Sequence, residues 1–216
     1  MPKKRHYYFL LIIFICTFNF IRVNSYNVPL RGKVIYLDPG HGGVDSGAQY
    51  KDILEKDINL ELCYLLMSAL ENKGAKVYMT RYDDYDLSNN GVALRKRSDL
   101  YNRAKVINES DADLYLSIHL NSTNSAKWHG IQIFYDDIND NNKVVAQKIQ
   151  DEFDSKREIS EISTKYMYKR ITIPGVLVEL GFLSNSGDRA NLLDEEKREE
   201  MINKIVDGVV NYYKSP

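Results

Sequence analysis

Two histidines and two glutamates stand at positions where a side chain could take part in catalysis or bind a metal. His41 lies in the glycine-rich stretch "VIYLDPGHGGVDSG", residues 34–47, directly after a run typical of a strand. His119 and Glu179 end two further apolar runs, "LYLSIH" and "PGVLVE", and Glu55 opens a helical pattern. The glycines around His41 indicate a backbone that bends sharply or comes close to another group.

These residue types suit metal-assisted hydrolysis. Two imidazoles and one carboxylate are a usual ligand set for catalytic zinc, with the fourth position left to water. Zinc lowers the pKa of that water to about 7. A second carboxylate that does not bind the metal can take the proton and pass it to a leaving nitrogen. The set therefore predicts hydrolysis of an amide, and two histidines with a carboxylate favour zinc over other divalent ions.

Each residue also has a structural interpretation. Glu55 follows Asp52 by three residues, which is the spacing of a capping box at a helix start. His119 could be a hydrogen-bonded polar residue at a strand end, and His41 could be incidental to a glycine-rich turn. Glu179 is harder to explain in this way, because a carboxylate inside "VLVELGF" is costly unless it is paired or faces a site.

Three other residues are secondary candidates. Asp38 and Asp45 lie close to His41 in the sequence and are either rival ligands or partners that orient its ring. His129, next to Trp128, is interpreted as a loop residue or a substrate contact rather than a ligand.

The elements that must position these residues alternate between strands and helices. Strands are expected at residues 33–38, 75–80, 112–119, 130–136 and 174–181, and helices from residue 55, around 100–107 and 201–212, with weaker helical stretches at 142–153 and 160–169. This alternation predicts a single α/β domain with a largely parallel, twisted sheet and helices on both faces. Because ligands bind at the carboxyl ends of such strands, the four candidate residues should converge on one edge.

The first 25 residues differ from the rest of the chain. A basic cluster, residues 3–5, precedes an apolar run, residues 7–21, which is typical of an export signal. An uncleaved N-terminal membrane anchor is the alternative. We divide the chain into this leader (1–25), a linker (26–32) and a catalytic domain (33–216).

Charge and cysteine content narrow the class of protein further. Without the leader the chain loses four basic and no acidic residues, so the formal net charge falls from −1 to −5. An acidic domain argues against nucleic acid as a partner. Cys63 is then the only cysteine, which excludes an internal disulfide and suggests a small buried hydrophobe.

The same residues carry a family resemblance. The stretches "IYLDPGHGGVDSGA", "LEKDINLEL", "MTR", "DADLYLSIHLNS" and "PGVLVELGFLSN" resemble the successive motifs of the zinc-dependent N-acetylmuramoyl-L-alanine amidases, over nearly all of residues 33–213. The resemblance implies that His41, Glu55 and His119 hold one Zn²⁺ per chain and that Glu179 is the catalytic carboxylate. It also implies peptidoglycan as substrate, with cleavage between N-acetylmuramic acid and L-alanine.

Within the family the chain is most similar to the germination-specific amidases of spore-forming bacteria. That similarity implies action in the spore cortex, where removal of peptides allows muramic-δ-lactam to form for germination. A vegetative cell-wall amidase (autolysin), a non-catalytic wall-binding protein on the same fold, and another kind of zinc hydrolase are the alternatives. The expected location is outside the membrane, in the cell wall, the forespore intermembrane space or the cortex, with membrane contact only through the leader.

The chain departs from relatives in three ways. Leu120 follows His119 where many relatives have alanine, no long helical insertion separates His119 from Glu179, and no wall-binding repeats are present. The site is therefore expected to be open. Control is expected from outside the chain, through timing of expression or an exported regulatory protein partner.

Overall fold

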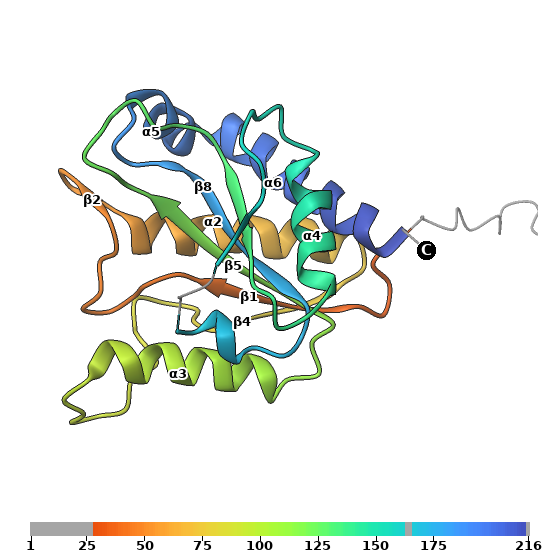
Figure 1. Ribbon diagram of the computed structural model, residues 1–216, viewed down its shortest axis with the longest axis horizontal. Helices are drawn as coiled ribbons and strands as arrows, with labels where there is room; N and C mark the ends of the chain where they lie inside the picture. The colour runs from red at the N-terminus through yellow and green to blue at the C-terminus, as the bar shows by residue number, and fades with distance from the viewer. Residues whose placement is uncertain (1–27, 163–165, 215–216) are drawn as a thin grey trace, which may run out of the picture.

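A computed structural model describes residues 28–162 and 166–214, and its centre is one six-stranded sheet. The strand order is β4-β1-β5-β8-β6-β7 (Figure 1). The strands are β1 (Val34–Pro39), β4 (Lys76–Met79), β5 (Leu114–Asn121), β6 (Gln132–Tyr135), β7 (Ser160–Glu161) and β8 (Gly175–Phe182). β4, β1, β5 and β8 are parallel to one another, whereas β6 is antiparallel to β8 and parallel to β7. The expectation of a largely parallel sheet is confirmed.

Helices cover both faces of the sheet. The helices α2 (Glu55–Asn72), α4 (Asn141–Gln150) and α6 (Glu195–Lys214) pack on one face, and α3 (Arg95–Asn108) with the 3₁₀ turn η1 (Tyr168–Arg170) packs on the other (Figure 1). The larger core cluster includes Leu62 of α2, Val145 of α4 and Ile205 of α6. The smaller one contains Ile107 of α3 and Tyr115 of β5.

Strand alternation determines which face each site residue occupies. Successive side chains of a strand point to opposite faces, and Tyr115 and Leu177 contribute to the core beneath α3. His119 lies four residues after Tyr115, and Glu179 lies two residues after Leu177, so both belong to the α3 face. They are also direct register partners on the neighbouring strands β5 and β8.

Several local expectations are corrected. The helical stretch expected at 160–169 is wrong in its described part, because Ser160–Glu161 pairs with β6 and only one 3₁₀ turn follows at Tyr168–Arg170. The helix α5 (Ser186–Leu193) was not expected from the pattern. Its start is stabilised by Asn185, whose side chain accepts hydrogen bonds from the backbone N–H groups of Gly187 and Asp188.

The amino-terminal end of the described chain is part of the packed domain. Leu30 is fully buried, and its N–H donates to the carbonyl of Lys73 at the end of α2. The packed part therefore begins before residue 33. Cys63 is buried in α2 as a free thiol, as expected. The expected leader, residues 1–25, lies outside the described residues.

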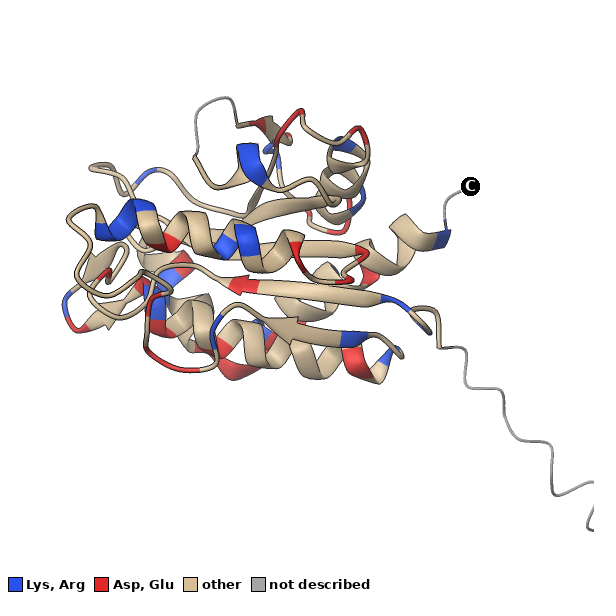
Figure 2. Ribbon diagram, turned by 90° about the horizontal axis from the view of Figure 1, so that it is seen from below, with Lys and Arg blue, Asp and Glu red and all other residues tan. Residues whose placement is uncertain are grey.

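The described surface carries charges of both signs. Figure 2 shows Lys and Arg interspersed with Asp and Glu, with basic residues at the amino-terminal end of α3. Within the described residues, no helix combines the length and apolar character needed to cross a membrane.

Candidate metal centre

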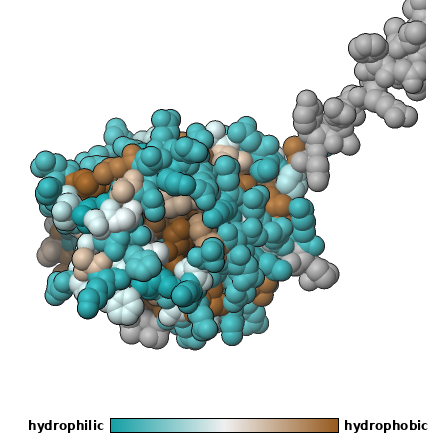
Figure 3. Space-filling view, turned by 90° about the horizontal axis from the view of Figure 1, so that it is seen from above, coloured by the Kyte–Doolittle hydropathy of each residue, from teal (hydrophilic) through white to brown (hydrophobic). Residues whose placement is uncertain are grey.

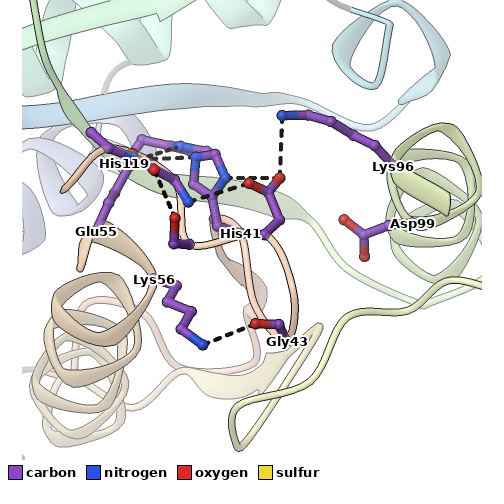
Figure 4. Close-up of polar contacts among 12 residues, drawn as sticks. His41, Gly43, Glu55, Lys56, Lys96, Asp99 and His119 are labelled. Atoms are coloured by element: carbon purple, nitrogen blue, oxygen red, sulfur yellow. Dashed lines mark hydrogen bonds and ion pairs between the residues drawn. The ribbon is translucent and has the colours of Figure 1, made fainter.

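Three of the predicted residues meet at the carboxyl edge of the sheet. Glu55 Oε1 lies 2.9 Å from Nδ1 of His119 and 3.3 Å from Nε2 of His41. The two imidazole rings are 4.9 Å apart and nearly perpendicular. Figure 4 shows the three side chains pointing toward one another. One nitrogen or oxygen from each lies within 4.8 Å of the others, a spacing at which they could hold a single metal ion.

The loop after β1 is shaped to bring His41 to this point. His41 has φ 63°, a left-handed conformation that is uncommon for a residue with a side chain. A Cβ at Gly40 would lie 2.3 Å from the His119 ring. A Cβ at Gly47, whose φ is 66°, would lie 2.6 Å from Oε2 of Glu55. These two glycines are therefore needed for the close approach of the three ligands.

Two buried arginines hold the backbone of this loop. Arg81, at the end of the "MTR" stretch, donates from Nε to the Pro39 carbonyl at 2.9 Å and from Nη2 to the Gly40 carbonyl at 3.1 Å. Arg103 of α3 donates from Nη1 to Pro39 O at 2.8 Å and from Nη2 to His41 O at 2.5 Å. Both arginines are 1% exposed. The carbonyls on either side of the loop apex are thus fixed by charged donors.

Asp38 completes this buried network. Its Oδ1 accepts hydrogen bonds from Arg103 at 2.8 Å and Thr80 at 2.7 Å, and its Oδ2 accepts one from Ser117 at 2.7 Å. Burial alone raises the pKa of the Asp38 carboxyl, but Arg103 and the two hydroxyl donors outweigh burial and hold that pKa below its usual value. Asp38 is therefore a structural anchor for Arg103, and the interpretation as a rival ligand is wrong.

Asp45 has the other role that the sequence allowed. Its Oδ2 lies 3.1 Å from Nδ1 of His41 and 3.2 Å from the Lys96 ammonium. A carboxylate at Nδ1 orients the ring and keeps the Nε2 lone pair directed at the cluster. Asp45 thus supports His41 and is not part of the cluster of ligand atoms itself.

Glu55 is committed to the site and does not cap its helix. The N-cap of α2 is Leu54, which makes no side-chain cap, and Asp52 is exposed, so the capping-box interpretation is wrong. Glu55 Oε2 accepts a hydrogen bond from Ala48 N at 2.7 Å, and Oε1 accepts one from Leu120 N at 3.0 Å. Burial raises the pKa of the Glu55 carboxyl, but hydrogen bonds from His119 and His41 outweigh it and hold the pKa far below its usual range.

Glu179 lies beside the cluster without belonging to it. It is buried, with 6% of its surface exposed, and stands directly opposite His119 in the β5–β8 register. The backbones of neighbouring strands are about 4.8 Å apart, so Glu179 and His119 start from adjacent positions on the same face of the sheet. β6, the strand on the other side of β8, places Gln132 directly opposite Glu179.

In its described part, the segment between His119 and Glu179 places no α-helix over the edge of the sheet where the cluster lies. Its one α-helix, α4, packs through Val145, Ala146 and Ile149 into the core on the opposite face. The side chains of His41 and His119 keep 18% and 17% of their surface exposed.

Sequence reasoning missed the arginines that support the site. The sequence pattern does point to Arg103, because this residue lies on the apolar face of α3 with Leu100, Ala104 and Ile107. A charge on that face requires a buried partner. His129 lies outside the cluster in the loop between β5 and β6, where its carbonyl accepts a hydrogen bond from Arg157 at 2.9 Å.

The fold and site together define a class: an α/β protein with a two-histidine, one-glutamate cluster at the carboxyl edge of a parallel sheet and a separate buried carboxylate beside it. A family model described as N-acetylmuramoyl-L-alanine amidase matches residues 35–211. The chain belongs to the N-acetylmuramoyl-L-alanine amidase family.

Individual relatives agree with this membership. The germination-specific N-acetylmuramoyl-L-alanine amidase of Bacillus subtilis is 39% identical over 216 residues, which covers 95% of this chain and 91% of the relative. The probable cell wall amidase LytH of Staphylococcus aureus is 36% identical, covering 86% of this chain and 60% of LytH. The CwlD amidase of Clostridioides difficile, solved in complex with the GerS lipoprotein, matches with TM-score 0.79 and 36% identity over 83% of this chain and 98% of CwlD.

Proposed function

We propose that this chain is a zinc-dependent amidase that cleaves peptidoglycan between N-acetylmuramic acid and the L-alanine of the stem peptide. The observation that carries the proposal is the cluster of His41, Glu55 and His119, whose ligand atoms lie within 4.8 Å of one another. This donor set is a usual one for catalytic zinc. Membership of the amidase family supports the identity of the bond.

Metal binding and proton transfer are assigned to different residues of the chain. His41 Nε2, His119 Nδ1 and Glu55 Oε1 face the centre of the cluster and would hold Zn²⁺. Zinc in such a site supplies a nucleophile at neutral pH by acidifying water. Glu179 accepts the proton that the attack releases and passes it to the nitrogen of the leaving L-alanine. Its burial next to His119 suits it to this exchange, because the proton then has only a short distance to travel.

We further propose that the enzyme acts on spore cortex peptidoglycan, where removal of stem peptides allows muramic-δ-lactam to form. Similarity to the germination-specific amidase of B. subtilis over 95% of the chain supports this role. The basic cluster and apolar run at residues 3–21 support export, with cleavage of the leader or retention as an anchor. The CwlD–GerS complex supports the idea that an exported protein partner binds this chain too.

A vegetative cell-wall role is the second candidate, and the similarity to the probable cell wall amidase LytH favours it. Deletion of the gene distinguishes the two roles. Loss of muramic-δ-lactam from purified cortex, with normal vegetative wall, is the result expected for the cortex enzyme. A vegetative defect with normal cortex would support the second candidate.

The activity itself is tested by digesting purified peptidoglycan and identifying the new ends by mass spectrometry. Lactyl carboxyl groups on muramic acid and free L-alanine amino termini are expected. Glu179→Gln should retain zinc and lose activity by about 10²- to 10⁴-fold, the usual contribution of a general acid–base group. Loss of zinc from Glu179→Gln would make Glu179 a ligand, and new ends elsewhere in the peptide or glycan would overturn the amidase assignment.

A further inference from the structure

A cationic and aromatic cluster lies next to Gln132, the residue of β6 that pairs with Glu179, and is not used by the proposed chemistry. The Arg157 guanidinium lies 5.2 Å from the centre of the Trp128 ring and 4.8 Å from that of Phe182. Trp128 is 55% exposed, whereas Phe182 is buried. Trp128 and Arg157 also line a surface cavity of about 870 Å³ that opens on the α6 side of the sheet, together with residues of α5 and α6. Figure 3, which views the side of α5 and α6, shows apolar side chains in a hollow surrounded by hydrophilic ones.

Arg157 is held in place by Gln132 of β6 and by the loop that precedes β6. Its Nη1 donates to Gln132 Oε1 at 2.8 Å, and its Nε donates to His129 O at 2.9 Å. Gln132 pairs directly with Glu179 across β6 and β8, and the two side chains share a face of the sheet. Arg157 is therefore bonded to the β6 residue opposite Glu179, and β6 is the neighbour of β8 on the side away from His119.

The charge of Arg157 is not balanced within the described part of the chain. Arg157 belongs, with Arg81 and Arg189, to the arginines that form no ion pair with a described carboxylate, whereas Arg103, Arg95 and Arg198 each form one. Its two bonds to described residues use two of its five N–H donors. A half-buried guanidinium with remaining donors, fixed between two rings, is suited to bind a carboxylate in a forked geometry.

We infer that Arg157 binds a carboxylate of the stem peptide and makes the enzyme selective for acidic peptides. The inference rests on the proposed function. Glu179 delivers its proton to the nitrogen that leaves with the peptide, so groups on its far side from His119 contact the peptide and not the sugar. In the uncleaved substrate the lactyl carboxyl is part of the amide, which leaves only the peptide to offer a free carboxylate near the scissile bond.

The test compares two substrates that differ in one charge. Muramoyl-L-alanyl-glutamate is prepared with a free α-carboxylate and as its α-amide, and kcat/KM is measured for each. The wild-type protein should prefer the acid by about 10- to 100-fold, which corresponds to one hydrogen-bonded ion pair. In Arg157→Gln the preference should disappear, because kcat/KM for the acid falls by far more than kcat/KM for the amide. Arg157→Lys should recover part of the preference, because it keeps the charge and loses the fork.

Lys156→Gln is the matched control, because it removes one positive charge from the adjacent exposed residue. It should retain the preference for the acid, and all variants should retain the zinc content and urea midpoint of the wild type. Equal loss on both substrates in Arg157→Gln, or no preference in the wild type, would overturn the inference. Failure of the wild type to cleave either substrate would instead overturn the proposed function.

Discussion

The two sides of the site are built in different ways. On the His41 side, Arg81 and Arg103 are 1% exposed and hydrogen-bond to backbone carbonyls at fixed distances of 2.5 to 3.1 Å. On the Glu179 side, Trp128 is 55% exposed and Arg157 is half-buried between loops. The proposed metal centre would tolerate little error in the placement of its ligands, whereas the proposed peptide contact could adjust when the substrate arrives.

This difference has an energetic consequence. Charges buried on the His41 side are costly to leave unpaired, so substitutions there should affect folding and metal binding together. Trp128 is exposed and Arg157 is half-buried without an ion-pair partner among the described residues, so substitutions there should affect substrate recognition more than folding. The following predictions test that separation.

The largest effect is expected from removing a ligand. His119→Ala should abolish hydrolysis and weaken zinc binding, because the cluster keeps only one imidazole. The fold should persist, since His119 stands at the end of β5 and contributes to neither core cluster. Zinc content measured by mass spectrometry of the native protein, with far-ultraviolet circular dichroism, checks both parts. Full activity with one zinc per chain would show that His119 is not a ligand.

Arg103→Met should have the next largest effect. It leaves Asp38 and Asp99 buried without their shared partner, at a cost of about 3–5 kcal/mol in the free energy of unfolding. Zinc affinity should fall as well, by about 10- to 100-fold, because the His41 carbonyl loses its donor.

Lys105→Met on the same helix is the control, because its ion pair with Glu109 is exposed at both ends and should contribute at most about 0.5 kcal/mol. Urea denaturation measures stability, and competition with a chelator measures zinc affinity. The prediction is contradicted if Arg103→Met unfolds at a lower urea concentration but binds zinc as tightly as the wild type, because folding and metal binding would then be independent on the His41 side.

The pH dependence of stability should reveal the same network. The pKa of Asp38 is below its usual value in the folded protein, so its contribution to stability is present above about pH 4 and is lost as the pH falls further. Asp99 acts with the opposite sign, because burial raises its pKa despite Arg103. Asp38→Asn should be less stable at pH 7 and lose stability less steeply below pH 4. Urea midpoints at several pH values check this, and parallel curves for the two proteins would contradict it.

The sequence predicted the convergence of His41, Glu55 and His119 better than it predicted the residues that support them. His41, Glu55, His119 and Glu179 could be placed at one edge because strand ends and helix starts of an α/β sheet share that edge. The left-handed loop, by contrast, depends on arginines that lie 41 and 62 residues after the carbonyls they contact, and no local pattern predicts such a contact.

The same distinction explains the errors in secondary structure. Residues 160–161 carry a pattern that fits a helix, but a neighbouring strand edge, β6, was available to pair with them. Asp52 and Glu55 have the spacing of a capping box. The Glu55 carboxylate instead contacts His41, 14 residues before it, and His119, 64 residues after it. Contacts distant in sequence outweigh local propensity in both places.

The smallest effect is expected from Trp128→Ala, on the opposite side of the site. The ring is 55% exposed, so the free energy of unfolding should change by about 0.5 kcal/mol or less. Zinc content should be unchanged, because Trp128 contacts no ligand. The KM for an acidic muramoyl peptide should rise by about 2- to 5-fold, the equivalent of one cation–π contact that holds Arg157 in position. Trp128→Phe keeps an aromatic ring, so its KM should lie between that of the wild type and that of Trp128→Ala. If Trp128→Ala instead lost zinc or several kcal/mol of stability, the two sides of the site would not be built separately, because a surface ring would then support the same buried structure that Arg103 does.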